Sequence, residues 1–281
     1  MIERFDVKHN GNEKVICAHR VGDVIVDPGP TNALDNWLPA LGDFEPRAIL
    51  LTHIHLDHAA ATGELVRRFP KAEVYVHEVG APHMVDPTRL LASAGRVYDG
   101  PLEEIFGEFA PVPAENVHTI ADGEAVYGFR ALHTPGHSGH HLSFLHEETG
   151  TALTGDVAGV SFWPHQFAFV PTPPPEIDLD LWDQSIVKLQ EWGPQSLSLT
   201  HFGEIPEAGP YLERFVEDLS WTREQSRAGD PVAYRAAIEA RAAESLPAEL
   251  HNTLWQAATA FDQVWMGLDR FWRKRAEREQ S

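Results

Sequence analysis

The segment AILLTHIHLDH at residues 48–58 runs from four apolar residues into three histidines and one aspartate. The apolar start has the composition of a buried strand, so all four metal-competent side chains follow one strand end. Imidazole and carboxylate together suit zinc, iron, manganese or cobalt, and the lack of thiolates argues against a structural zinc site. We expect His53 and His55 to face one way and Asp57 and His58 another. A single ion would leave ligands unused, so the segment predicts two.

Three later residues of the same chemical kind also follow predicted strands. His137 comes after residues 129–132 through a Pro-Gly turn, and Asp156 and His201 each follow a further strand. A carboxylate at Asp156 can bridge two cations, because each of its oxygens can hold one ion. Ligands in layered α/β folds lie in loops just beyond strand ends, so these segments predict one shared site.

The chain alternates short strands with helical patterns up to about residue 206 and is helical afterwards, which predicts an α/β fold. We expect an α/β domain over 1–206, with a lid-like helical insertion at 81–117, and a C-terminal helical extension over 207–281 packed on the core. The predicted strands are 15–18, 23–26, 48–52, 73–76, 129–132, 141–145, 152–154 and 197–200. The predicted helices are 59–68, 87–94, 101–109, 180–192 and much of 207–275.

Two features of the second half of the sequence concern packing. The prolines of residues 171–175 predict a rigid extended segment, because each fixes its φ and restricts the residue before it. Apolar and aromatic residues recur at seven-residue intervals in the C-terminal region and need a surface to bury them. We expect this stripe to pack on the chain's own core, with a homodimer seam through these helices as the alternative. The stripe consists of Leu254, Phe261, Trp265, Leu268 and Trp272.

The composition narrows the classes of partner and compartment. The formal charge of -20 over 281 residues would repel nucleic acid and anionic lipid surfaces, so we expect a small-molecule substrate and neither a nucleic-acid nor a membrane partner. The single cysteine cannot form an internal disulfide, and the sequence shows neither a signal-peptide pattern nor an apolar span for a membrane. These features favour a cytoplasmic protein.

The motifs, taken in order, resemble those of the metallo-β-lactamase superfamily, in its glyoxalase II-like hydrolase branch. The resemblance covers roughly residues 15–203 and implies a four-layer αββα sandwich, followed here by the C-terminal helical extension. It also implies a first metal on His53, His55 and His137, a second on Asp57, His58 and His201, and Asp156 as the bridge. The matching motifs are Asp27-Pro-Gly29, His53-x-His55-x-Asp57-His58, His137, Asp156 and His201.

The ligand motifs and the resemblance together predict a dinuclear metal-dependent hydrolase that cleaves an ester, thioester or lactone through a metal-bridging hydroxide. The expected cofactors are two divalent ions, zinc first, with manganese or iron as alternatives. Asp57 and Asp156 are the expected catalytic residues, the former as a proton acceptor.

Two alternatives stay open at this point. A mononuclear iron oxidoreductase resembling the persulfide dioxygenases is the first, although the complete second ligand set argues against it. A phosphodiesterase or nuclease is the second, and the acidic charge argues against it. Within the resembled superfamily, the acyl-homoserine lactonases carry a tyrosine shortly after the bridging aspartate. This chain has residues 157–160, VAGV, at that place, so lactone cleavage would lack the tyrosine.

Weaker expectations concern residues around the ligands. Asp27 is expected to brace a loop, and His140 is a candidate to support the metal ligands from behind. Trp163 and His165, in an irregular aromatic segment after Asp156, are candidates to line a substrate pocket. Arg89, Arg96 and Tyr98 of the insertion are expected on the solvated surface rather than in contact with a substrate carboxylate.

Overall fold

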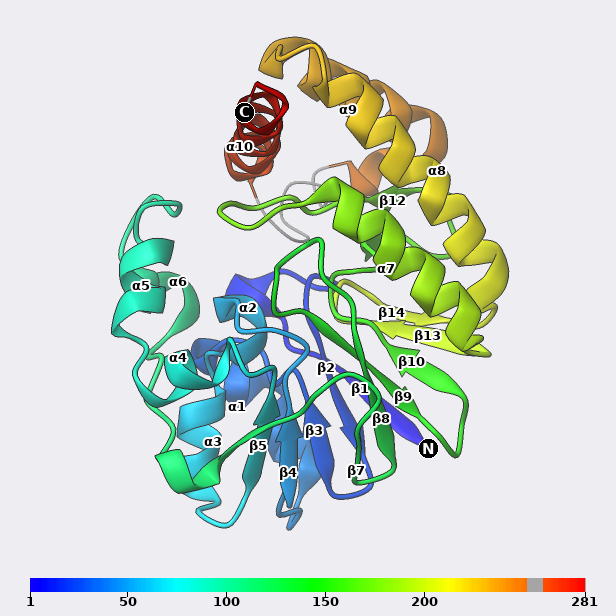
Figure 1. Ribbon diagram of the computed structural model, residues 1–281. Helices are drawn as coiled ribbons and strands as arrows, with labels where there is room; N and C mark the ends of the chain where they lie inside the picture. Colours follow the sequence, from blue (N-terminus) through cyan, green and yellow to red (C-terminus); the bar gives the residue numbers. More distant parts are fainter. Residues whose placement is uncertain (252–259, 281) are drawn as a thin grey trace.

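The computed structural model describes residues 1–251 and 260–280, and over these it forms two mixed six-stranded sheets between outer layers of helices (Figure 1). The first sheet consists, in spatial order, of β1 (Ile2–Asp6), β2 (Cys17–Val21), β3 (Val24–Val26), β4 (Ala48–Leu50), β5 (Glu73–Val76) and β6 (Val117–Thr119). The second consists, in spatial order, of β14 (Gly203–Ile205), β13 (Ser196–Leu199), β10 (Thr151–Leu153), β9 (Leu142–His146), β8 (Phe129–His133) and β7 (Ala125–Val126).

Helices cover the outer face of each sheet, which completes the αββα order (Figure 1). The first sheet is covered by α1 (Leu34–Trp37), α2 (Leu56–Ala59), α3 (Thr62–Arg68), α4 (Ala81–Val85), α5 (Thr88–Ala94) and α6 (Leu102–Phe106). The second is covered by α7 (Leu179–Trp192), α8 (Ala208–Ser226) and α9 (Pro231–Ser245), and α10 (Phe261–Glu279) packs at one end. The predicted fold class is confirmed.

Apolar burial holds these layers together in three clusters. Between the sheets, Val24 and Leu50 of the first sheet pack with Phe129 and Phe144 of the second. The other two clusters fill the spaces between each sheet and its own helices. The central strands β3, β4 and β10 therefore bury both faces, which explains why they read as mostly apolar runs.

The strand directions bring the predicted ligands to one edge of the sandwich. Strand β3 runs parallel to β4, and β10 runs parallel to β13. Strand β8 is antiparallel to β9, which is antiparallel to β10, so β8 and β10 share a direction. Because the carboxyl ends of β4, β8, β10 and β13 lie at the same side of their sheets, the loops that follow them meet there (Figure 1).

Several predicted boundaries are wrong in ways that affect the site. The helix expected over 59–68 is two helices, because the Ala61 N–H bonds to the Gly29 carbonyl instead of continuing the first helix. That first helix, α2, begins at Leu56, so the ligand motif itself enters a helix. Strand β2 starts later than the expected 15–18, since its ladder with β1 begins at Cys17.

Other strands and two helices escape the sequence patterns. Strands β11 (Val160–Ser161) and β12 (Ala168–Phe169) pair as a two-stranded hairpin where an irregular segment was expected. Strands β1, β6, β7 and β14 and helices α1 and α4 were also not predicted. These elements are short, so their hydrophobic period has few residues in which to appear.

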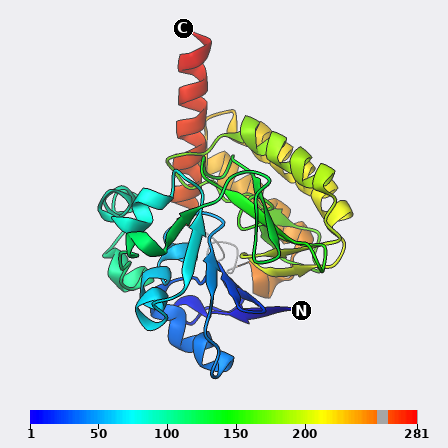
Figure 2. The ribbon, with the colours of Figure 1, turned by 60° about the horizontal axis from the view of Figure 1, so that its bottom comes forward.

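The C-terminal stripe lies against the chain's own core where the structure describes it. Phe261 and Leu268 are buried with residues of the second sheet's helices, and Trp265 and Trp272 pack against the same cluster. Leu254 lies outside the described residues. Figure 2 shows that the end of α10 extends away from the rest of the molecule. Among the described helices, none is both long enough and apolar enough to cross a bilayer.

Candidate metal centre

The structure brings all seven sequence-predicted ligands into one buried cluster. Three overlapping groups each place one ligand atom per residue within 4.8 Å of the others. The groups are His53, His55 and His137; Asp57, His58 and His201; and His53, His58 and Asp156.

The first set consists of three histidines whose ring nitrogens point at one another. His55 Nδ1 lies 3.0 Å from His53 Nε2 and 3.0 Å from His137 Nε2. Burial and the neighbouring imidazoles lower the pKa of His53 well below its ordinary value and that of His55 to about 3, and burial lowers the pKa of His137. Neutral imidazoles are the form that binds a metal ion, so this set is prepared for one.

The second set mixes histidines with carboxylates. His201 Nε2 lies 3.3 Å from Asp57 Oδ2, and His58 Nε2 lies 3.1 Å from Asp156 Oδ1. The other oxygen of Asp156, Oδ2, lies 3.2 Å from His137 Nε2 of the first set. Asp156 therefore turns one oxygen toward each set, as a carboxylate that bridges two cations would.

Charges balance within the second set in the metal-free chain. Burial opposes the charged form of His58 and of His201, but the surrounding carboxylates, Asp156 foremost, outweigh it and raise both pKa values. Burial likewise opposes ionisation of Asp57 and Asp156, and the facing imidazoles, His58 foremost, outweigh it and lower these pKa values. Here protons occupy the place that a cation would take, so metal binding should release them.

Buried polar atoms without a partner test whether a metal ion fits. His58 Nε2, His201 Nε2 and Asp156 Oδ1 are buried, and within the described residues they have no hydrogen bond of acceptable geometry despite their short separations. Unsatisfied buried polar atoms are costly, and convergent imidazole and carboxylate atoms are the donor set of zinc, manganese and iron. The residues present therefore fit a pair of divalent cations.

Outer contacts hold four of the ligating imidazoles by the nitrogen that faces away from the cluster. A hydrogen bond of this kind fixes both ring orientation and tautomer, and it raises the basicity of the ligating nitrogen. The contacts are His53 Nδ1 to Thr52 Oγ1 at 3.1 Å, His58 Nδ1 to Asp27 Oδ2 at 2.9 Å, His137 Nδ1 to the Pro171 carbonyl at 3.0 Å and His201 Nδ1 to the Val15 carbonyl at 2.6 Å.

Asp27 is the centre of this outer layer. Its carboxylate accepts hydrogen bonds from the Thr52 N–H at 2.8 Å, the Thr52 hydroxyl at 2.7 Å and the Thr200 hydroxyl at 2.9 Å, besides its contact with His58. It is fully buried and has a left-handed backbone with φ of 48°. The residue expected to brace a loop therefore joins two ligand-bearing loops, the one that holds Thr52 and His58 and the one that holds Thr200 and His201.

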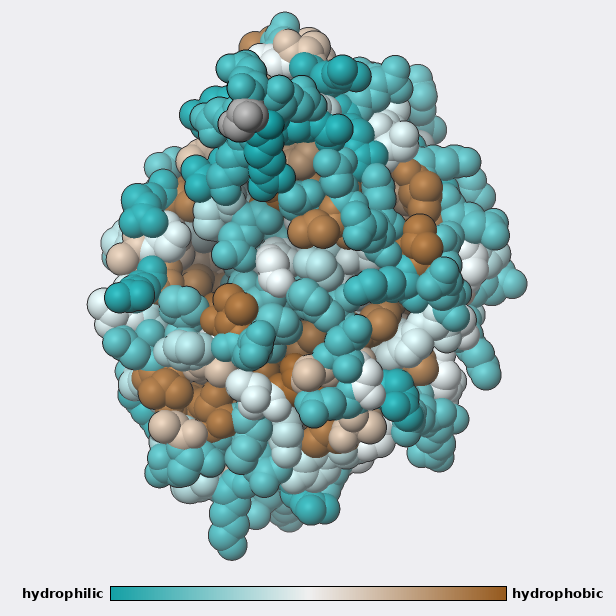
Figure 3. Space-filling model, viewed as in Figure 1, coloured by the Kyte–Doolittle hydropathy of each residue, from teal (hydrophilic) through white to brown (hydrophobic). Residues whose placement is uncertain are grey.

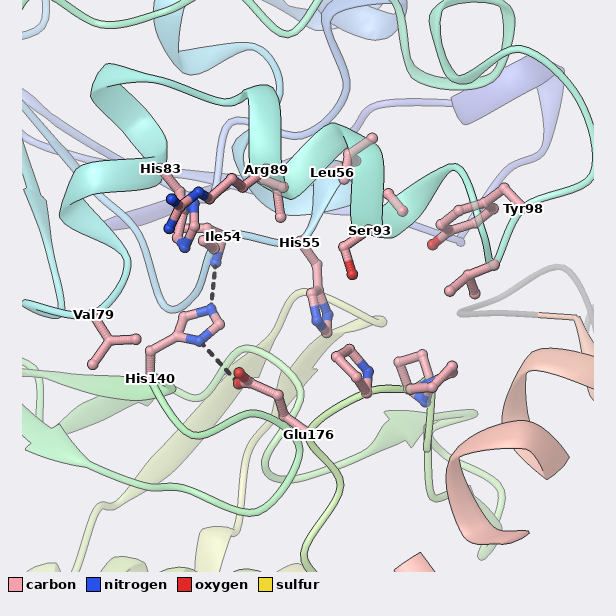
Figure 4. A pocket seen from close by; sticks show the side chains of 16 residues that line it. Ile54, His55, Leu56, Val79, His83, Arg89, Ser93, Tyr98, His140 and Glu176 are labelled. Atoms are coloured by element: carbon pink, nitrogen blue, oxygen red, sulfur yellow. Dashed lines mark hydrogen bonds and ion pairs between the residues drawn. The ribbon is translucent and has the colours of Figure 1, made fainter. Parts of the chain in front are cut away.

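Two adjacent histidines also hold the backbone of the ligand loops. His140 Nε2 accepts a hydrogen bond from the Ile54 N–H at 3.3 Å, and its Nδ1 lies 3.4 Å from Glu176 (Figure 4). His140 thus holds the backbone between His53 and His55, two of the predicted metal ligands. His141, expected as the first residue of a strand, precedes β9 instead, and its Nε2 accepts a hydrogen bond from the Asp156 N–H at 3.1 Å.

Gly155 permits the close packing beside the bridging aspartate. Its φ is +49°, and a Cβ there would lie 2.5 Å from Thr52 Oγ1 and 2.7 Å from His141 Nε2. Both the left-handed backbone and the missing side chain are therefore required, so the residue before Asp156 is constrained as strongly as the ligand itself.

A cavity of about 260 Å³ opens beside His55, between the insertion and residues 173–176 (Figure 4). On the face of the molecule seen in Figure 3, hydrophobic side chains gather in patches on an otherwise hydrophilic surface. Trp163 and His165, the expected pocket residues, are not in its wall, and Trp163 is 43% exposed near the hairpin of β11 and β12.

Two of the three insertion residues singled out by sequence line this cavity. Arg89 and Tyr98, expected on the solvated surface, both stand in its wall, whereas Arg96 does not. Burial, and then the charges of Asp57 and Asp156, raise the pKa of the Tyr98 hydroxyl. Tyr98 therefore stays protonated close to the carboxylates of the metal centre. Arg89 and Tyr98 reach the cavity because the insertion packs beside the metal centre, and the sequence alone does not show this packing.

Comparisons with known proteins agree with this geometry. The model of the metallo-beta-lactamase superfamily matches residues 15–192. A metallo-beta-lactamase fold-containing protein of Sulfurisphaera tokodaii is 28% identical over 200 residues, which make up 68% of this chain and 72% of that protein. A hydroxyacylglutathione hydrolase of Xylella fastidiosa is 33% identical over 126 residues, but the match covers 43% of this chain and only 36% of that protein.

Solved structures show the same fold. An archaeal metallo-beta-lactamase superfamily protein from Sulfolobus tokodaii superimposes with a TM-score of 0.66 at 24% identity, over 79% of this chain and 85% of that one. A metallo-beta-lactamase family protein from Thermus thermophilus has a TM-score of 0.64 at 21% identity, over 93% and 88% of the two chains. The family model matches more than half of this chain, and the ligand motifs occur in order. The chain therefore belongs to the metallo-beta-lactamase superfamily.

Proposed function

We propose that the chain is a dinuclear metal-dependent hydrolase that cleaves an ester, thioester or lactone of a small organic molecule. The observation that carries the proposal is the position of Asp156, whose two oxygens face the two ligand sets separately. The partial similarity to proteins named hydroxyacylglutathione hydrolases supports a hydrolytic reaction. The complete second set, with Asp57 and two histidines, favours two ions over one.

Each residue of the centre has a role in this proposal. Two bound divalent cations would supply an activated water and polarise the substrate carbonyl. One ion would be held by His53, His55 and His137, the other by Asp57, His58 and His201, with Asp156 shared.

Two residues of the chain handle protons and hydrogen bonds around the reacting bond. Asp57, which would lie beside the second cation, has a carboxylate that could accept a proton from the attacking water. The protonated Tyr98 hydroxyl, in the wall of the adjoining cavity, is placed to donate a hydrogen bond to a substrate oxygen as negative charge develops there.

For Tyr98→Phe we expect kcat/KM to fall about 10- to 100-fold, because one hydrogen-bond donor to the developing charge is lost. Metal content should stay unchanged, since Tyr98 belongs to none of the ligand groups. Tyr127→Phe is the matched control: its hydroxyl donates to Glu73, away from the cavity. An unchanged kcat/KM in Tyr98→Phe would remove this residue from the reaction.

The proposal as a whole is tested by metal analysis and chelation. We expect about two ions of zinc, manganese or iron per purified chain, and turnover of activated thioesters, esters or lactones that a chelator abolishes and added metal restores. Turnover that persists in the chelated protein would contradict a metal-dependent reaction. About one iron per chain, with oxygen uptake on a glutathione persulfide, would replace the hydrolase with an oxidoreductase.

A further inference from the structure

The cavity beside the metal centre has a mostly apolar wall. Its volume of about 260 Å³ lies just under the range of roughly 300–1,000 Å³ that is typical of small-molecule sites, so a small ligand would fill it. The wall joins the ligand loop, the insertion and the proline-rich segment. Its main apolar residues are Ile54, Leu56, Leu90, Val97 and Pro173–Pro175.

Most polar groups in this wall are already engaged or belong to the metal centre. His55 is one of the first-set ligands. Glu176 accepts a hydrogen bond from the Gly139 N–H at 3.0 Å and faces His140, whose other nitrogen holds Ile54. The hydrogen bond with His140 foremost lowers the pKa of Glu176 to about 2, so its carboxylate is ionised and is held toward the His140 loop, while Arg89 is the cationic side chain of the wall.

Arg89 differs from most arginines of the chain. Arginines such as Arg67, Arg223 and Arg275 pair with carboxylates. Arg89 lines the cavity, yet within the described residues its guanidinium has no carboxylate within 4.0 Å and makes no hydrogen bond. Asp86, three residues earlier, accepts hydrogen bonds from Thr88 instead. The hydrogen bonds from Thr88 foremost lower the pKa of Asp86, and Asp86 is near enough for the charge of Arg89 to contribute to this shift, but it forms no ion pair with Arg89. In a chain of net charge -20, a guanidinium in a cavity wall without a direct carboxylate partner is informative.

The order of groups along the cavity suggests how a substrate would lie. In the view of Figure 4, Arg89 and His83 lie at one end and Tyr98 at the other, with His55 between them. A substrate whose scissile carbonyl lies near His55 and Tyr98 would extend an apolar portion along the wall toward Arg89. A single guanidinium forms two parallel hydrogen bonds with a carboxylate, and the apolar wall between Arg89 and His55 suits a tail whose only charge is at its end.

We infer that this cavity selects substrates whose apolar chain ends in a carboxylate, and that Arg89 is the residue that recognises this end. The inference rests on the proposed function and deepens it: the substrate class becomes an ester or thioester of a dicarboxylic acid, or one with an equivalent anionic tail. The acidic surface of the chain would repel such a substrate at long range, and Arg89 offsets this locally.

Ligand binding tests the inference without any need for turnover. The probes are linear dicarboxylates from succinate to sebacate, each compared with the monocarboxylate of the same length, titrated calorimetrically into the metal-loaded protein. At the best length the wild-type protein should bind the dicarboxylate about tenfold or more tightly than its monocarboxylate partner, as a charge-assisted pair predicts. Arg89→Met should abolish this preference and leave monocarboxylate affinity unchanged.

Arg227→Met is the matched control, because Arg227 is likewise exposed and without an ion pair in the described structure but lies outside the cavity wall. It should keep the full dicarboxylate preference. The inference is overturned if the wild-type protein shows no preference at any length, binds neither series, or keeps its preference in Arg89→Met. Hydrolysis of the matching thioesters is measured in parallel: an Arg89-dependent preference without hydrolysis would overturn the proposed function while leaving the recognition of the anionic end intact.

Discussion

Asp156→Ala should lose both metal ions together, with a fall in kcat/KM of about 10³-fold or more. The reason is that Oδ1 of Asp156 faces His58 while Oδ2 faces His137, so one substitution removes a ligand from each set. The loss also leaves the buried His58 without the carboxylate that contributes most to raising its pKa. Metal content by elemental analysis and activity on the best substrate measure the two effects.

Asp57→Ala provides the comparison that isolates bridging. Asp57 belongs only to the second set, where its Oδ2 faces His201 at 3.3 Å. This variant should therefore lose about one ion per chain and keep the first, whereas Asp156→Ala should retain neither. Circular dichroism of both metal-free variants checks that the fold survives. Two tightly bound ions in Asp156→Ala would refute a bridging role for this carboxylate.

The sequence predicts that the ligands converge because most of them directly follow strands, and the positions of these strand ends place the side chains. His53 through His58 directly follow β4, and Asp156 and His201 directly follow β10 and β13. A residue just past the end of a buried strand has little freedom to leave the sheet's edge, so recognising the strand places the side chain. The same locality explains why the fold class follows from the strand pattern and the motif order.

The cavity wall and the outer layer depend on contacts between distant segments. The insertion reaches the site because Thr31 donates to the Glu108 carbonyl at 2.7 Å and Asn32 to the Ile105 carbonyl at 2.9 Å. Neither pair has a signature in the sequence. The surface role expected for Tyr98 is wrong for this reason, since its ring packs on Phe106 with centroids 5.0 Å apart.

Asp27→Asn should weaken metal binding more at the second site than at the first. The carboxylate contacts His58 directly but reaches His53 only through the Thr52 hydroxyl. Removing the partner of a ligating imidazole commonly costs about 10- to 100-fold in metal affinity, and we expect this range at the second site. Asparagine tolerates the left-handed backbone of this position, so the substitution tests charge rather than strain.

The same variant should lower the free energy of unfolding of the metal-free protein by about 3 kcal/mol, because an amide cannot accept from all the donors that Asp27 satisfies, and the buried His58 loses its charged partner. Chelator competition reports the affinities and urea denaturation the stability. Asp23→Asn is the control: it breaks an exposed pair with Arg47, worth at most about 1 kcal/mol. If Asp27→Asn kept wild-type affinity at the second site while losing stability, Asp27 would only brace the loops, and the orientation of His58 would have to come from its burial alone.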